Sequence, residues 1–160
     1  MTYIQNKKIQ NYVHNVDTNF TKEVISTSIE DYPGTEVTYT PPAGTSKVVY
    51  ECNLQTAWNP DTAATYLSTR LQYSDDSGSS WNDIDGSKLF EGSNAASSAD
   101  YDWYNYFWIF HLDSWSGERK LRLAGRAQAT SREGTIGRSY NANGSEGVGS
   151  CPHVSVYSII

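Results

Sequence analysis

The sequence is poor in the residues that build disulfide frameworks, helices and membrane spans. Its 160 residues include two cysteines and one methionine, and Ala, Leu, Glu and Lys nowhere gather into a helix-length run. We expect Cys52 and Cys151 as buried free thiols, with a bridge between them as the alternative. No stretch reaches the ~18 apolar residues of a membrane span, and residues 1–13 lack the apolar segment of a signal peptide. These absences predict a protein made in the cytoplasm that does not insert into membranes.

Motifs for catalysis and nucleic-acid binding are also missing. The chain has no G-x-S-x-G, H-E-x-x-H, G-x-x-x-x-G-K or C-x-x-C pattern. A net charge of −6 argues against a nucleic-acid surface, because phosphate binding depends on Lys and Arg. Six basic residues do fall between Arg119 and Arg138, and we interpret them as a solvated strand face balanced by the acidic stretch Asp75–Asp102. We expect no enzyme, no cofactor and no nucleic acid.

Signals for a metal site are weak. Three histidines are scattered through the chain, at His14, His111 and His153. Three copies of His111 near a threefold axis could gather an anion or a metal, but a histidine bonded to backbone is commoner. Two pairs of aspartates stand one residue apart, Asp83 with Asp85 and Asp100 with Asp102. Neither pair has the spacing of a complete calcium loop, so we interpret them as turn carboxylates and expect no metal.

Aromatic residues are abundant, with five Trp, twelve Tyr and four Phe, and they favour strands. Roughly eight to ten short strands with turn signals between them predict a sandwich or barrel, and a jelly roll fits best. The class is therefore an all-β, antiparallel β-sandwich. We expect an N-terminal arm or edge strand over residues 1–21 and the jelly-roll domain over 22–160. The clearest expected strands cover 24–29, 36–40, 47–57, 65–73, 101–112, 119–130 and 153–160, with a brief one near 135–137.

The segment Tyr101–Leu112 is apolar on both sides of a strand. A strand hydrophobic on both faces normally lies between two layers. The opposing sheet supplies one layer, and another copy of the subunit is the most economical second layer. The alternative is a central strand in a large monomeric sandwich. We expect an oligomer interface formed by Tyr104, Tyr106, Phe107, Trp108, Ile109, Phe110, Tyr157 and Ile159.

Two further segments carry local predictions. An Asp-box pattern, Ser-x-Asp-x-Gly-x-Ser-Trp, is matched by Ser74, Asp76, Gly78, Ser80 and Trp81. It predicts a stapled turn in which the carboxylate accepts backbone N–H groups, Gly takes a left-handed conformation and Trp packs under the hairpin. One such box cannot build the repeated blades of a sialidase-type hydrolase. In Arg119–Thr130 one face tapers from Leu to Gly and Ala, which predicts close approach to a bulky group, with the aromatic strand as the candidate.

The proline-stopped early strand, the strand KVVYECNLQTA, the aromatic strand, the glycine-rich loop and the final strand together resemble the tumour-necrosis-factor-like trimeric jelly roll. The resemblance covers about residues 22–160 and implies a homotrimer. The Gly/Ser/Asn-rich loops and the bare methionine start look like small virion proteins of tailed bacteriophages, which implies a capsid decoration protein or a fibre or receptor-binding tip. Other virion proteins, and a host-surface glycan, are the candidate partners, and the virion is the expected location. The alternative is a carbohydrate-binding jelly-roll module, in which exposed Trp58, Trp115 and Tyr140 would stack on sugars.

Overall fold

The structure is a computed structural model that describes residues 8–16, 23–58, 65–93, 102–127, 134–136, 138–140, 146–148 and 151–160. Within these residues the regular structure is entirely strand. The strands follow in the order β1 (Ile9–Val16), β2 (Glu23–Ile25), β3 (Glu30–Asp31), β4 (Val37–Tyr39), β5 (Lys47–Trp58), β6 (Thr65–Ser74), β7 (Asn82–Asp83), β8 (Leu89–Ser93), β9 (Asp102–Asp113), β10 (Arg119–Ala127), β11 (Gly134–Ile136), β12 (Arg138–Tyr140), β13 (Glu146–Val148) and β14 (His153–Ile159).

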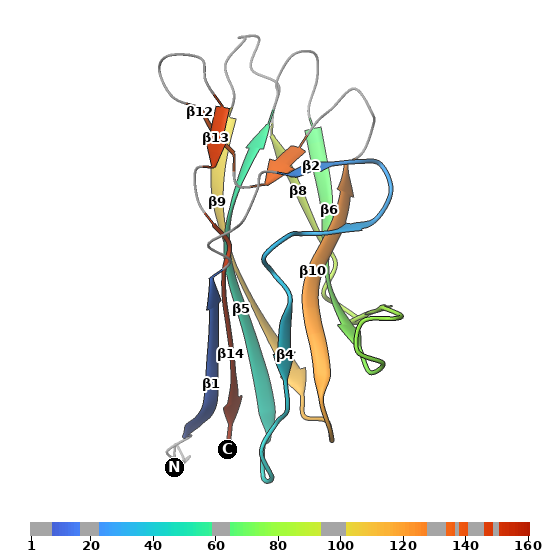
Figure 1. The fold of residues 1–160 in the computed structure, drawn as a ribbon, viewed down its shortest axis with the longest axis vertical. Coiled ribbons are helices and arrows are strands. Elements are labelled where there is room, and N and C mark those ends of the chain that lie inside the picture. Colours follow the sequence, from blue (N-terminus) through green and yellow to red (C-terminus); the bar gives the residue numbers. More distant parts are fainter. Residues whose placement is uncertain are drawn as a thin grey trace, which may run out of the picture.

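Twelve of the strands form two antiparallel sheets that pack face to face (Figure 1), and β12 and β13 pair in a separate two-stranded sheet. One sheet has the order β1-β14-β5-β9, and β11 and β2 extend it beside the end of β5. The other has β10 and β6 at its centre, β3 and β4 on the far side of β10, and β7 and β8 on the far side of β6. Strands nearby in sequence alternate between the sheets, as in two interlocked Greek keys. This connectivity defines a jelly roll and confirms the fold predicted from the sequence.

Pairing of the first and last strands brings both ends of the described chain together. Ile9 lies opposite Ile159, and the N–H of Ile160 donates to the carbonyl of Lys8 at 3.1 Å. The start of β1 and the end of β14 therefore lie at the same end of the sandwich (Figure 1). Within residues 1–21, where the sequence predicts an arm or an edge strand, β1 is therefore a strand paired with β14.

The core combines aliphatic side chains with tyrosines whose hydroxyl groups are all bonded. Leu54, Leu67, Leu71 and Leu123 are fully buried between the sheets. A buried hydroxyl without a partner is costly, and three fully buried tyrosines avoid that cost: Tyr32 bonds Thr69 Oγ1 at 2.7 Å, Tyr39 bonds Ser158 Oγ at 2.8 Å, and Tyr50 donates to the carbonyl of Thr35 at 2.7 Å. These bonds fix how the short strands β3 and β4 pack on the long ones.

The taper of β10 has a different cause from the one predicted. Strand β10 pairs with β6, β3 and β4, and it lies in the sheet opposite β9. A Cβ atom on Gly125 would lie 2.1 Å from the hydroxyl of Tyr32 and 2.7 Å from the carbonyl oxygen of Ser68. The bulky neighbour is therefore Tyr32 rather than the aromatic strand, because the ring crosses the sheet interior to reach Thr69.

Cys52 and Cys151 are thiols and are not joined by a disulfide, so the bridge that the sequence left as the alternative does not form. Cys52 is fully buried between the sheets, and burial raises the pKa of its thiol to about 12. Cys151 is only half-buried, so the expectation that both thiols are buried is wrong for Cys151, which lies just before β14 rather than inside a strand.

Candidate functional site

Strand β9 sends alternate side chains to opposite sides of its sheet, and only one side is core. The register places Trp108 opposite Cys52 and Phe110 opposite Tyr50. Cys52 and Tyr50 are fully buried between the sheets. The inward set on β9 is therefore Tyr104, Tyr106, Trp108, Phe110 and Leu112, and the outward set is Asn105, Phe107, Ile109, His111 and Asp113.

This alternation divides the eight residues predicted as an oligomer interface. Four of them face the interior: Tyr104, Tyr106, Trp108 and Phe110. Trp108 is 7% exposed within one chain, and its ring stacks on that of Tyr106 with centroids 5.3 Å apart. Trp108 is therefore covered within one chain, because successive strand residues point to opposite faces, whereas Tyr104 on the same inward side is 36% exposed. Phe107, Ile109, Tyr157 and Ile159 stay as the predicted interface.

The side chains of β1, β14, β5 and β9 that point away from the core form one surface, which we name the outer face. It comprises Ile9, Tyr12, His14, Val16, Lys47, Val49, Glu51, Asn53, Gln55, Asn105, Phe107, Ile109, His111, Asp113, His153, Ser155, Tyr157 and Ile159. Phe107 is 60% exposed and Ile109 is 47% exposed, while Ile9 and Tyr12 reach 62% and 59% at the opposite side of the sheet. Single exposed apolar residues are ordinary, but a group of this size on one sheet face marks an interaction surface.

The edge of the sheet beside Phe107 is also open. Among the described strands, β9 pairs with β5 alone, so its other edge has unpaired backbone groups along much of Asp102–Asp113. Unpaired edges of long strands are sites where another chain can add. On the outward side of this edge Asn105, Phe107 and Ile109 are uncharged, and Asp113 at its end is paired with Lys47 of β5.

An aromatic and polar cluster occupies the middle of the outer face. The ring of Tyr12 stacks on that of Tyr157 with centroids 6.0 Å apart, and its hydroxyl bonds Ser155 Oγ at 2.9 Å. The Tyr157 hydroxyl donates to Glu51 Oε1 at 2.8 Å. Partial burial, and then the adjacent Glu51 carboxylate, raise the pKa of Tyr157 to about 12. The Glu51 carboxylate therefore accepts a hydrogen bond from the neutral hydroxyl of Tyr157.

The Asp-box residues form a stapled turn after β6. Asp76 accepts from the N–H of Ser80 at 2.9 Å and from its hydroxyl at 2.6 Å, and Ser74 Oγ accepts from the N–H of Gly78 at 2.8 Å. Gly78 has φ of 97°, and a Cβ atom there would lie 3.6 Å from the Lys120 side chain and 3.7 Å from the Trp81 ring. Hydrogen bonds from Ser74 and Ser80 hold the pKa of Asp76 well below its usual range. The turn projects from the side of the sandwich in Figure 1.

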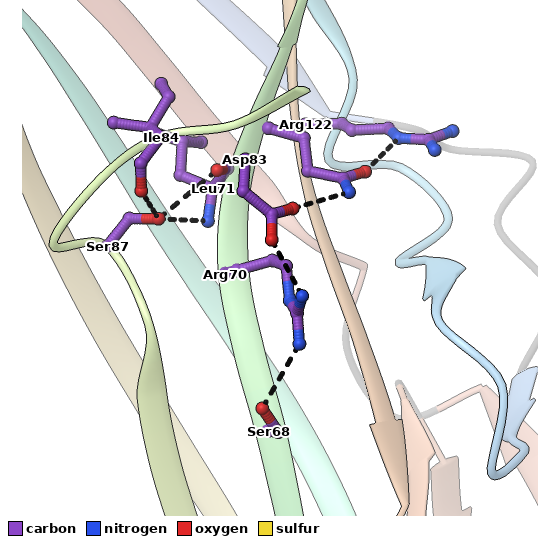
Figure 2. Close-up of polar contacts among 8 residues, drawn as sticks. Ser68, Arg70, Leu71, Asp83, Ile84, Ser87 and Arg122 are labelled. Atoms are coloured by element: carbon purple, nitrogen blue, oxygen red, sulfur yellow. Dashed lines mark hydrogen bonds and ion pairs between the residues drawn. The ribbon is translucent and has the colours of Figure 1, made fainter. Parts of the chain in front are cut away.

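The outward side of the second sheet is a hydrogen-bonded ladder of charged and polar groups (Figure 2). Arg122 donates to Gln72 at 3.1 Å, Gln72 donates to Asp83 at 2.9 Å, and Arg70 donates to the other oxygen of Asp83 at 2.7 Å. Burial opposes ionisation of Asp83, but the bonds from Gln72 and Arg70 outweigh it and lower the pKa of Asp83. Asp83 is thus a structural acceptor in this ladder.

Three of the four basic residues of β10 pair with described acids. The pairs are Arg119 with Asp75 at 2.5 Å, Lys120 with Glu36 at 2.7 Å and Arg122 with Asp31 at 3.7 Å. Two of the three acids come from the segment before β5 rather than from the predicted acidic stretch. Arg132 and the side chain of Arg138 lie outside the described residues.

A cleft of about 380 Å³ opens between the ends of β6, β7, β9 and β10. Trp115 and Tyr73 line it, together with Asp83, Asp85, Asp113, His111 and Arg119. The Arg119 guanidinium lies 4.5 Å from the centre of the Tyr73 ring and 5.3 Å from that of Trp115. Of the aromatics predicted to stack on sugars, Trp115 therefore borders a cleft, whereas the side chains of Trp58 and Tyr140 lie outside the described residues.

The described side chains give no cluster of three or more metal-ligating groups. His111 is exposed on the outer face, and Asp83 is held in the ladder. Asp100 and the side chain of Asp102 lie outside the described residues.

The pairing of β1 with β14 was not predicted from the sequence. It brings Tyr12 and His14 next to Tyr157 and His153. Alternation in the last strand placed His153 and Tyr157 on one face, but their neighbours depend on long-range pairing.

The two sheets and their connections define the class: this is a jelly-roll β-sandwich with an exposed apolar sheet face. By sequence, no protein family and no curated protein matches the chain. The solved structure of Eiger TNF from S. frugiperda aligns over 93% of this chain and 93% of its own, with 10% sequence identity and a TM-score of 0.39. The structure of infectious bursal disease virus Gx strain aligns over 99% of this chain and 42% of its own, with 9% identity and a TM-score of 0.18. Among the described residues no helix has the length and hydropathy to cross a membrane.

Proposed function

We propose that this chain is a non-enzymatic structural protein that assembles with copies of itself through the outer face. The observation that carries the proposal is the exposure of Phe107 and Ile109, at 60% and 47%, beside the unpaired edge of β9. Burying such side chains is favourable by about 1.5–3 kcal/mol each. A second copy supplies the same apolar stripe, so self-association covers it without another component.

The number of subunits and the location of the assembly are proposed from the resemblance of the sequence to trimeric jelly rolls. In those trimers aromatic strands stack around a threefold axis, and the last strand lies centrally in the inner sheet. Here β14 lies between β1 and β5 in the sheet that carries the outer face. We propose a homotrimer on the virion surface of a tailed bacteriophage, as a capsid decoration protein or a fibre or receptor-binding tip. Other virion proteins are the proposed docking partners.

Two isoleucines of equal exposure make a matched test. Ile109 on the outer face and Ile29 between β2 and β3 are both 47% exposed. An aspartate buried unpaired in an interface costs about 3–5 kcal/mol, whereas the same change on a free surface costs little. Ile109→Asp should therefore turn a trimer into monomers in light scattering, with an unchanged circular dichroism spectrum, and Ile29→Asp should leave the trimer intact. A monomeric wild type, or equal dissociation by both variants, would contradict the proposal.

Carbohydrate binding by the cleft is the second candidate function. The observation in its favour is that Trp115 and Tyr73 border the cleft together with the exposed Asp85, a combination of apolar walls and a few polar groups that suits a small polar ligand. Asp85→Asn should weaken retention on a glycan array, and Glu118→Gln, an exposed change outside the cleft lining, should not. Absence of glycan binding by the wild type would exclude this candidate and leave the assembly proposal standing.

A further inference from the structure

Two histidines from opposite ends of the chain meet on the outer face. His14 of β1 lies opposite Ser155 of β14, and His153 lies two residues before Ser155 on the same strand. The two imidazole rings are 5.8 Å apart between centroids and inclined by 44°. Both residues are exposed. His14 lies three strands and His153 two strands from Phe107 on the same outer face, so the pair adjoins the proposed assembly surface and a metal site there goes beyond that assembly.

The separation of the rings suits a shared metal ion. A transition metal lies about 2.0–2.1 Å from an imidazole nitrogen. With the ring centre roughly 1.1 Å behind that nitrogen, two ligands on one ion have centres about 5 Å apart at a tetrahedral angle and about 6 Å apart at wider angles. The observed 5.8 Å falls within this range. A shared ion requires one nitrogen of each ring to face the same point, and for His14 that nitrogen is Nε2, because Nδ1 lies beside Ser155.

The hydroxyl oxygen of Ser155 lies where it can accept from Nδ1–H of His14, which is the tautomer that such a site needs. Nδ1 of His14 lies 3.0 Å from Ser155 Oγ, and the ring stacks on that of Tyr12 with centroids 6.4 Å apart and planes 14° apart. When the serine oxygen accepts from Nδ1–H, Nε2 keeps its lone pair for a ligand bond. A hydrogen bond from the second nitrogen to an oxygen is the usual support of a metal-binding histidine. Ser155 is itself buried and bonded by Tyr12, which fixes the supporting oxygen.

The charge around the pair also favours a cation. Glu51 of β5 lies opposite Ser155, on the far side of β14 from His14, and the chain has a net charge of −6. We propose that His14 and His153 form a two-histidine site for a borderline transition-metal ion such as Cu²⁺, Ni²⁺ or Zn²⁺, with water in the remaining positions. Imidazole ligands suit these ions, and neither Ca²⁺ nor Mg²⁺ prefers them.

Titration calorimetry of the untagged protein with NiCl₂ or CuCl₂ alone tests the site. One ion should bind per chain, and each of His14→Asn and His153→Asn should weaken binding by at least about tenfold. His111→Asn is the matched control, because His111 is also exposed on the outer face but lies on β9. It should leave the affinity within about twofold of wild type.

A second readout separates a bound metal from a loss of structure. The metal should raise the melting temperature of the wild type and of His111→Asn but not of the two pair variants. No binding at millimolar metal, unchanged affinity in the pair variants, or an equal loss in His111→Asn would each overturn the proposal.

Discussion

Gly125 gives the sharpest test of how the two sheets pack. A glycine within a strand is normally less stable than alanine by about 0.5–1 kcal/mol, so Gly125→Ala would stabilise an open site. Here the added Cβ would lie 2.1 Å from the hydroxyl oxygen of Tyr32, 2.7 Å from its Cζ atom and 2.7 Å from the carbonyl oxygen of Ser68. Overpacking costs about 1–3 kcal/mol. Displacing Tyr32 also strains its 2.7 Å bond to Thr69, worth about 1 kcal/mol.

The net expectation is a loss of about 1–3 kcal/mol in the free energy of unfolding. For a chain of this size it lowers the melting temperature by roughly 3–10 °C. Urea unfolding should be measured for Gly125→Ala, Tyr32→Phe and the double variant. Because Tyr32→Phe removes the nearest clashing atom, the double variant should lose less than the sum of the two single changes. A Gly125→Ala protein as stable as wild type would refute the packing argument.

Three further predictions concern titrating groups. Asp76→Asn should destabilise the protein at neutral pH, and the difference from wild type should shrink in urea titrations as pH falls from about 4 toward 2, since a lowered pKa gives stability that acid removes. Tyr157, with its pKa raised to about 12, should stabilise the fold fully below about pH 10 and lose this contribution as pH rises to 12. Ultraviolet titration should show its late ionisation, and Glu51→Gln should bring it earlier. In a Cys151→Ser background, Cys52 should not react with a thiol reagent at pH 8 until urea unfolds the protein, because burial raises the pKa of Cys52 to about 12.

The long strands were predictable because their own side chains determine them. Expected strands at 47–57, 65–73 and 101–112 correspond to β5, β6 and β9 within a residue or two at each end. The period of two in these segments continues long enough to outweigh other signals. By contrast β3, β7, β12 and β13 have two or three residues each. Such short strands form only because a partner strand lies beside them. The pattern of residues within two or three positions does not indicate which strand that partner is.

The candidate site was predictable only in part, for a related reason. Alternation along β9 separates Phe107 from Trp108, but it does not tell which of the two sides the second sheet covers. The predicted interface therefore took residues from both sides, Trp108 and Phe107 among them, and the register with β5 shows which side faces the opposing sheet. The proximity of His14 and His153 could not be predicted from the sequence, because it depends on pairing between strands β1 and β14. The neighbour of Gly125 is another such long-range contact.

The adjacency of β1 and β14 has a practical consequence for engineering. Because Ile9 and Ile159 are paired, a passenger domain fused at either end would leave the sandwich from the same pole. A short peptide could also bridge the two ends, and the ring so formed could be cut at an exposed turn such as that of Gly86 without separating any long strands. Circularly permuted versions of this protein should therefore keep the same sheet order while presenting new ends at the side of the sandwich.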